Sequence, residues 1–255
     1  MGEALIGGLL SSGAMAPAEI AVVEVSVERR SALVERFAGV RVVADPVVAA
    51  GAVLAVKPPE VPAVAARSAE LGISRILSLA AGVTLRVLDE AVAGAAHPVA
   101  VVRSMPNTPA LVGRGAAAIC GGAHATRADL EWAEEVLGAV GLVVRVPEHQ
   151  MDAVTGLSGS GPAYAFLVAE ALIDAGVAAG LPRDVAEALT VQTLLGSAAM
   201  LSETGDHPAA LRNAVTSPGG TTAAGLAVLE EGGLRAALAG AVAAATARSR
   251  QLGSS

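Results

Sequence analysis

The sequence predicts an α/β chain with a doubly wound parallel sheet over residues 1–147 and an all-helical region over residues 148–255. In the first region, short β-branched runs alternate with helical stretches, the pattern of parallel strands joined by crossover helices. After Pro147 no further β-branched run appears, and alanine- and leucine-rich segments follow. Because the chain has 255 residues, of which 53 % are apolar, it can bury the cores of two domains.

Seven strands and two clear helices account for the first region. The helices span residues 27–37 and 128–140, and Thr126 is the expected N-cap of the second. The chain opens on another helix, residues 1–10, whereas doubly wound sheets that bind dinucleotides begin with a strand and a glycine-rich turn. We therefore expect the first strand of this sheet to be absent. The predicted strands are 20–24, 40–43, 52–56, 75–79, 99–103, 116–120 and 142–146.

The helical region contains a helix, residues 163–177, whose surface is almost wholly apolar. Its only charges, Glu170 and Asp174, lie one turn apart. The rest of its circumference needs a cover, and the remaining helices of this region can bury little alone. A second copy of the chain is the simplest cover, so we expect an obligate homodimer or a larger assembly through this half.

Composition narrows the classes of function. A net charge of −7 without a cluster of lysine or arginine argues against binding to nucleic acid. The longest uncharged stretches run to about 17 residues and are broken by Gly, Pro, Ser and Thr, so we expect no membrane-spanning helix. One cysteine, four scattered histidines and no secretory signal indicate a cytoplasmic protein without a metal site.

The segment 152–164 is dense in glycines and hydroxyl side chains. Its glycines let the backbone approach another surface closely, while Thr155, Ser158 and Ser160 supply hydrogen-bonding groups. This composition fits a binding site, and it equally fits a close helix–helix contact with an N-cap.

A second dense segment, residues 215–226, is a flexible loop that runs into a helix. Helix N-termini leave backbone N–H groups free and carry partial positive charge. A carboxylate site is therefore predicted at Gly219, Gly220, Thr221 and Thr222, with an elaborate N-cap as the alternative.

The third candidate is the run of residues 55–59 at the carboxyl end of a predicted strand, where open α/β sheets bind their ligands. It contains Lys57, the only lysine among 17 basic residues. The unusual residue favours a ligand contact, and an ordinary surface lysine is the alternative.

Together these segments resemble the pyrroline-5-carboxylate reductases, which catalyse the last step of proline biosynthesis. The resemblance keeps the family's order and spacing over essentially the whole chain. The matching stretches are residues 2–8, 55–58, 78–82, 103–109, 152–164 and 217–226, of which the last two are nearly diagnostic.

The resemblance implies a Rossmann-type first domain that holds NADPH, or alternatively NADH. The end of the 52–56 strand lies against the dinucleotide, Leu79 and Ala81 lie towards the nicotinamide, and Asn107 lies in a turn at the cleft. The implied cofactor-binding residues are Gly2, Ala55, Val56, Lys57, Pro58, Leu79, Ala81 and Asn107.

The resemblance also implies how the substrate, the ring imine pyrroline-5-carboxylate, is bound. Its carboxylate is held by the loop residues Ser217, Gly219, Gly220, Thr221 and Thr222, and the pocket is lined by Glu148, Thr155 and Ser158. Hydride passes from the nicotinamide to C5 of the imine, and orientation of the two rings supplies most of the rate. Thr222 is the candidate catalytic residue, forming a hydrogen bond near the ring nitrogen. The helical domain forms a homodimer, and dimers often assemble into decamers.

The chain departs from the family at its start, where only Met1 and Gly2 remain of a Gly-x-Gly-Asn-Met-Gly turn. We expect a natural protein about ten residues longer, given the length of the missing strand and turn; the alternative is a truncated product. Two further functions stay open: another imine or β-hydroxyacid-type reductase, or a truncated, catalytically weak paralogue acting only in assembly. The first typically needs a lysine in the helical half, and none follows Lys57. The intact 217–222 loop argues against the second.

The choice of cofactor depends on residues 24–30. Glu24 follows the 20–24 strand at the position that usually binds the ribose 2′-hydroxyl of NADH. Ser26, Arg29 and Arg30 follow closely and could hold the 2′-phosphate of NADPH. The family resemblance favours NADPH.

Overall fold

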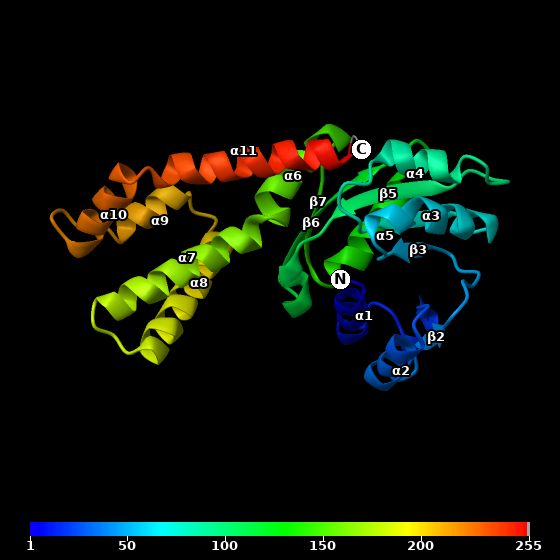
Figure 1. Ribbon diagram of the computed structural model, residues 1–255, viewed down its shortest axis with the longest axis horizontal. Helices are drawn as coiled ribbons and strands as arrows, with labels where there is room; N and C mark the ends of the chain where they lie inside the picture. Colours follow the sequence, from blue (N-terminus) through cyan, green and yellow to red (C-terminus); the bar gives the residue numbers. More distant parts are fainter. Residues whose placement is uncertain (254–255) are drawn as a thin grey trace. The chain divides into compact units, whose positions relative to one another are not determined.

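The computed structural model describes residues 1–253, which form two compact units (Figure 1). The first unit comprises Met1–Ser160 together with the described residues from Ala244 onward, and the second comprises Gly161–Ala243. Residues 148–160, predicted to open the helical region, therefore group with the sheet, and Met151 is fully buried in its core. The predicted division after residue 147, drawn from composition, stays a prediction.

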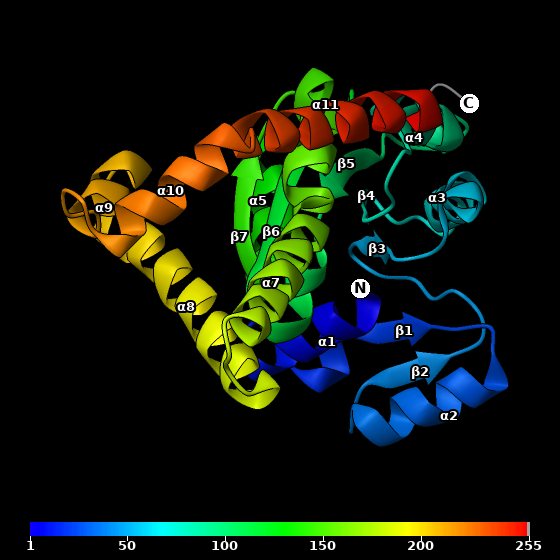
Figure 2. The ribbon, with the colours of Figure 1, turned by 60° about the vertical axis from the view of Figure 1, so that its left-hand side comes forward.

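The first unit contains two sheets. Five strands form a sheet in the order β3-β4-β5-β6-β7, and β1 pairs in parallel with β2 in a separate sheet (Figure 2). In the part of the chain that the structure describes, no strand pairs with both β1 and β3. The strands are β1 (Ala21–Val23), β2 (Arg41–Val43), β3 (Ala52–Leu54), β4 (Arg75–Ser78), β5 (Ala100–Met105), β6 (Gly115–Gly121) and β7 (Gly141–Arg145).

Helices cover both faces of the five-stranded sheet, so the predicted doubly wound fold is confirmed. Helices α3 and α4 share one buried core with Ile76 and Val101, while α1 and α5 share another with Leu77 and Val102. Neighbouring strand residues thus point to opposite faces, as a pleated sheet requires. The helices are α1 (Gly2–Ser11), α2 (Val27–Arg36), α3 (Val61–Glu70), α4 (Leu85–Val92), α5 (Arg127–Gly138) and α6 (Met151–Val154).

One strand pair departs from the predicted parallel sheet. Strand β6 runs antiparallel to β5, with Arg103 opposite Cys120, because a short turn over Thr108–Val112 joins them in place of a crossover helix. The other pairs of this sheet are parallel. The carboxyl ends of β3, β4 and β5 consequently share one edge.

Helix α1 packs against both sheets. Leu5 and Leu9 are buried in the core beneath the five-stranded sheet, whereas Ile6 and Leu10 pack against the small core of β1, β2 and α2. Each pair is four residues apart, so the helix presents two adjacent apolar stripes.

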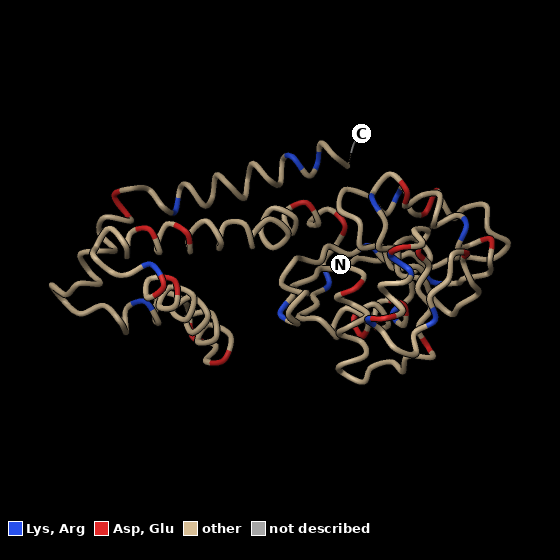
Figure 3. Tube along the Cα trace, turned by 60° about the horizontal axis from the view of Figure 1, so that its bottom comes forward, with Lys and Arg blue, Asp and Glu red and all other residues tan. Residues whose placement is uncertain are grey.

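The second unit is helical, as predicted. Helices α7 and α8 pack side by side, and long parts of α8 and α11 carry no charged residue (Figure 3). Several large apolar side chains are exposed, including Phe166 at 67 % and Leu195 at 62 %. The helices are α7 (Gly161–Ala178), α8 (Arg183–Thr204), α9 (Pro208–Ala214), α10 (Thr221–Glu231) and α11 (Leu234–Gly253), the last of which returns to the first unit.

Candidate active site

The carboxyl edge of the parallel strands carries most of the predicted cofactor residues. Ala55, Val56, Lys57 and Pro58 follow β3, and all but Val56 are exposed. A Cβ placed on Gly2, the first residue of α1, would lie 3.2 Å from the Cβ of Ala55. The amino end of α1, whose first N–H groups lack helical acceptors, therefore lies against this strand end.

Leu79 and Ala81 follow β4 at the same edge. The Leu79 N–H donates to the Leu54 carbonyl at 3.0 Å, which ties this strand end to β3. Leu79 is half-buried and Ala81 is exposed. The edge thus brings these residues to one place, and their predicted contact with the cofactor stays a prediction.

The end of β1 holds a cluster of charged groups around Glu24. Its carboxylate accepts a hydrogen bond from the Ser26 N–H at 3.0 Å and lies 3.2 Å from Nε of Arg29. Arg30 donates to the carbonyls of Glu24 and Val25 at 2.8 and 2.9 Å. Glu24 is therefore already paired with a cation.

Two predicted pocket residues lie on a π-helix, Thr155–Gly159, that directly follows α6. Thr155 and Ser158 donate their hydroxyl protons to carbonyls one turn earlier, those of Met151 and Val154. Their oxygens remain able to accept hydrogen bonds. Sequence reasoning did not predict this widened turn, which is common at functional sites.

Glu148, itself half-buried, lies at the centre of a polar cluster with the buried Arg103 and Cys120. Its Oε1 accepts hydrogen bonds from Arg103 at 2.6 Å and from the Leu85 N–H at 3.0 Å, and its Oε2 accepts from the Cys120 thiol at 2.9 Å. The Arg103 side chain is only 5 % exposed. Both carboxylate oxygens thus have partners within this unit, and the predicted role of Glu148 towards substrate stays a prediction.

The electrostatics of this cluster stabilise a charged Glu148. Burial alone would raise the pKa of the Glu148 carboxyl, but the hydrogen bonds from Cys120 and the Leu85 N–H, with the charge of Arg103, hold the pKa below its ordinary value. Burial, reinforced by the Glu148 carboxylate, raises the pKa of the Cys120 thiol. The cluster is therefore an ionised Arg–Glu pair with a neutral thiol beside it.

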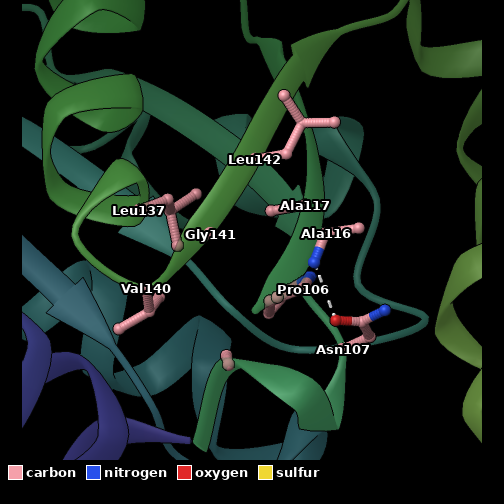
Figure 4. A pocket seen from close by; sticks show the side chains of 10 residues that line it. Pro106, Asn107, Ala116, Ala117, Leu137, Val140, Gly141 and Leu142 are labelled. Carbon is pink, nitrogen blue, oxygen red and sulfur yellow. Dashed lines mark hydrogen bonds between the residues drawn. The ribbon is translucent and has the colours of Figure 1, made fainter. Parts of the chain in front are cut away.

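Asn107 is held from two sides, and Figure 4 shows its hydrogen bond with Ala116. Its Oδ1 accepts a hydrogen bond from the Ala116 N–H at 2.8 Å, and its Nδ2 donates to the Ser158 carbonyl at 3.0 Å. The adjoining cavity measures ≈ 10 Å³, which is too small for a cofactor. The structure thus brings Asn107 to the π-helix, and its predicted contact with the cofactor stays a prediction.

The predicted carboxylate loop lies in the second unit, where α10 begins at Thr221 with Gly220 as N-cap. No side chain caps this helix, so the first-turn N–H groups are not used by an N-cap side chain. Gly219 adopts a φ of +68°, which favours glycine, and a Cβ on Gly220 would overlap the Ser217 hydroxyl. Ser217, Gly219 and Thr221 are exposed, while Thr222 is half-buried.

Among the described residues, no group of three His, Cys, Asp or Glu side chains could hold a metal ion. The expectation of a protein without a metal site stays a prediction.

Comparison with known proteins places these residues in a family. A family model described as pyrroline-5-carboxylate reductase dimerisation matches residues 148–252. The pyrroline-5-carboxylate reductase of Synechocystis sp. is 46 % identical over 259 residues, covering 99 % of this chain and 95 % of the relative. That of Arabidopsis thaliana is 45 % identical, covering 100 % of this chain and 93 % of the relative.

A solved structure agrees over nearly the whole chain. A pyrroline-5-carboxylate reductase from Coxiella burnetii superposes with a TM-score of 0.92 at 37 % identity, covering 98 % of this chain and 94 % of the other. The Plasmodium falciparum pyrroline carboxylate reductase, solved with NADP bound, gives a TM-score of 0.84 at 29 % identity, covering 99 % and 94 %. The chain therefore belongs to the pyrroline-5-carboxylate reductase family.

Proposed function

We propose that this protein reduces 1-pyrroline-5-carboxylate to L-proline in the cytoplasm, with NADPH as the preferred hydride donor and NADH as the alternative. The observation that carries the proposal is the match to pyrroline-5-carboxylate reductases over 99 % of the chain. The uncapped amino end of α10 at the predicted substrate loop supports it.

The cofactor is proposed to bind at the carboxyl edge of the five-stranded sheet. Gly2 and Ala55–Pro58 would hold the dinucleotide, with Leu79 and Ala81 towards the nicotinamide. The bound dinucleotide supplies a hydride at C4 of its nicotinamide ring. The protein's contribution is to orient the imine and to exclude water, since a protonated imine is already a good electrophile.

The imine carboxylate is proposed to bind at Ser217, Gly219, Gly220 and Thr221, where the free N–H groups of α10 attract an anion. Thr222 is the proposed catalytic residue, its hydroxyl forming a hydrogen bond near the ring nitrogen. Thr155 and Ser158 are proposed to line the pocket through their hydroxyl oxygens.

The preference for NADPH is supported by the surroundings of Glu24. An acidic side chain repels a 2′-phosphate, but Arg29 already neutralises this carboxylate at 3.2 Å. Substituting Arg29→Ala is expected to weaken NADPH binding by about tenfold or more, the loss of one charge-assisted contact, and to leave NADH binding within about twofold. Equal losses for both cofactors would contradict the assignment of Arg29 to the phosphate.

The dimerisation region supports self-association, and we propose a dimer that assembles further into a decamer. Glu148–Ala178 and Arg183–Thr204 are long and apolar enough to cross a membrane by length and composition alone. We propose that a second copy covers these helices, because exposed side chains such as Phe166, Leu189 and Leu195 would otherwise face water. The molar mass in solution, measured by light scattering, tests this.

The activity is tested by following oxidation of NADPH and of NADH with pyrroline-5-carboxylate. Thr222→Val is expected to lower kcat/KM for the imine by more than about tenfold, since a transition-state hydrogen bond is worth at least that much. Thr204→Val, which removes an exposed hydroxyl bonded only near the end of α8, is the matched control. A change within twofold for Thr222→Val removes its catalytic role, and no oxidation of either cofactor by the parent chain refutes the proposed function.

A further inference from the structure

Strand β5 holds the Glu148–Ser160 segment at two points. Arg103 and Met105 are two residues apart on the strand, so their side chains lie on one face, and Asn107 follows two residues after Met105. Arg103 pairs with Glu148 at the start of the segment, and Asn107 donates to the Ser158 carbonyl near its end. A Cβ on Gly159, the residue after Ser158, would overlap the Cε of Met105. The segment therefore follows this face closely.

The contacts of Asn107 use both heteroatoms of its side chain. Oδ1 accepts from Ala116 on β6 and Nδ2 donates to Ser158 on the π-helix. The amide thus joins the β5 turn, β6 and the π-helix. These two bonds fix the orientation of the amide and leave one lone pair of Oδ1 and one N–H of Nδ2 for other partners.

Both carboxylate oxygens of Glu148 likewise have partners on neighbouring elements. Its carboxylate joins β5, β6 and the first turn of α4 through Arg103, Cys120 and the Leu85 N–H. A buried arginine without its carboxylate would be uncompensated, so the pair fixes where the segment begins.

We propose that Asn107 and the Arg103–Glu148 pair are positioning residues for the imine: they fix the π-helix that carries Thr155 and Ser158. This rests on the proposed function, in which those two hydroxyls line the imine pocket. Asn107 and Glu148 then act through the segment whose position they fix.

Asn107→Asp tests the contact of Asn107 with the π-helix by an isosteric change. The variant keeps Oδ1 towards Ala116 but places an oxygen in place of the Nδ2 donor, facing the Ser158 carbonyl. We expect kcat/KM for the imine to fall by about tenfold to a hundredfold, the range for a misplaced binding group. The dissociation constant of NADPH, measured by titration without imine, stays within twofold. A rise in that constant by tenfold would instead make Asn107 a cofactor ligand and overturn the proposal.

Glu148→Gln tests the Arg103–Glu148 pair. It keeps an acceptor for the Leu85 N–H and removes the charge opposite Arg103. The matched control is Glu134→Gln, which breaks the Arg145–Glu134 pair between α5 and β7. We expect Glu148→Gln to lower kcat/KM for the imine and Glu134→Gln to leave it unchanged. Equal effects of the two substitutions would overturn the proposal.

A readout independent of activity separates the inference from the proposed function. Hydrogen exchange of the amides of residues 155–160 is expected to accelerate at least tenfold in Asn107→Asp, while exchange in β4 is unchanged. Unchanged exchange in 155–160 overturns the inference, whether or not the parent chain reduces the imine. A parent chain that binds NADPH but does not reduce the imine refutes the proposed function alone.

Discussion

Two adjacent glycines of α1 are expected to respond oppositely to the same substitution. A Cβ on Gly8 would overlap Cγ1 of Val140 and lie 2.8 Å from the carbonyl oxygen of Ala139, so α1 would have to move away from the end of α5. A Cβ on Gly7 would meet only Cε1 of Phe37 at 3.9 Å, an ordinary contact. Gly7→Ala and Gly8→Ala therefore differ in packing and not in chemistry.

The size of the difference follows from two terms. Replacing a helical glycine by alanine stabilises either variant by about 1 kcal/mol, so this gain cancels in the comparison. Overpacking costs about 1–3 kcal/mol, and the upper part applies at Gly8 because a backbone carbonyl cannot rotate away. We expect the free energy of unfolding of Gly7→Ala to exceed that of Gly8→Ala by about 2–3 kcal/mol. The Tm of Gly7→Ala should then be higher by roughly 4–12 °C.

The fluorescence of Trp132 provides the assay. It is the only tryptophan of the chain, and it packs against the core that contains Leu5 and Leu9 of α1. Thermal unfolding followed at this residue thus reports on the core against which α1 packs. If Gly8→Ala unfolds at or above the temperature of Gly7→Ala, the close approach of α1 and α5 is wrong.

Three further predictions concern Glu148, Cys120 and β7. The folded pKa of Glu148 lies below its ordinary value of 4.5, so the stability that this carboxylate contributes is present above pH 4.5 and is lost as the pH falls through the folded pKa. The acid unfolding of Glu148→Gln should therefore depend less steeply on pH than that of the parent. The raised pKa and burial of Cys120 predict that the native thiol does not react with a thiol-specific reagent at pH 8, whereas one thiol per chain reacts in denaturant; equal rates would contradict the buried position. Gly141→Ala should lower Tm sharply, because φ is +154° and a Cβ would overlap the Gly115 backbone, while Gly138→Ala, with open space at its Cβ, should not.

The order of strands and helices could be predicted because its signals are local. The β-branched runs that follow one another from residue 20 to residue 146 are strands in the structure, and Thr126 caps α5 as expected. The antiparallel β6 could not be predicted, since the connection from Met105 to Gly115 does not indicate in which direction the next strand runs.

The polar contacts of the candidate site were harder to predict because their partners are distant in sequence. Arg103 and Glu148 are separated by 45 residues, and Asn107 and Ser158 by 51. One signal was available: Arg103 ends an apolar run from Val99, and a buried arginine requires a carboxylate. The partner itself could be identified only in three dimensions.

The position of α1 between two sheets has a consequence for local opening. The β1–α2–β2 unit has its own small core of Leu33, Phe37 and Val40, and in the described residues its strands make no ladder to the larger sheet. It is joined to the rest chiefly through Ile6, Leu10 and the exposed pairs of Glu3 with Arg29 and Arg36. Such a unit forms a cooperative element of lower stability that can open while the five-stranded sheet stays folded. Since Glu24 lies on this unit, a ligand that contacts it would also stabilise the unit against opening.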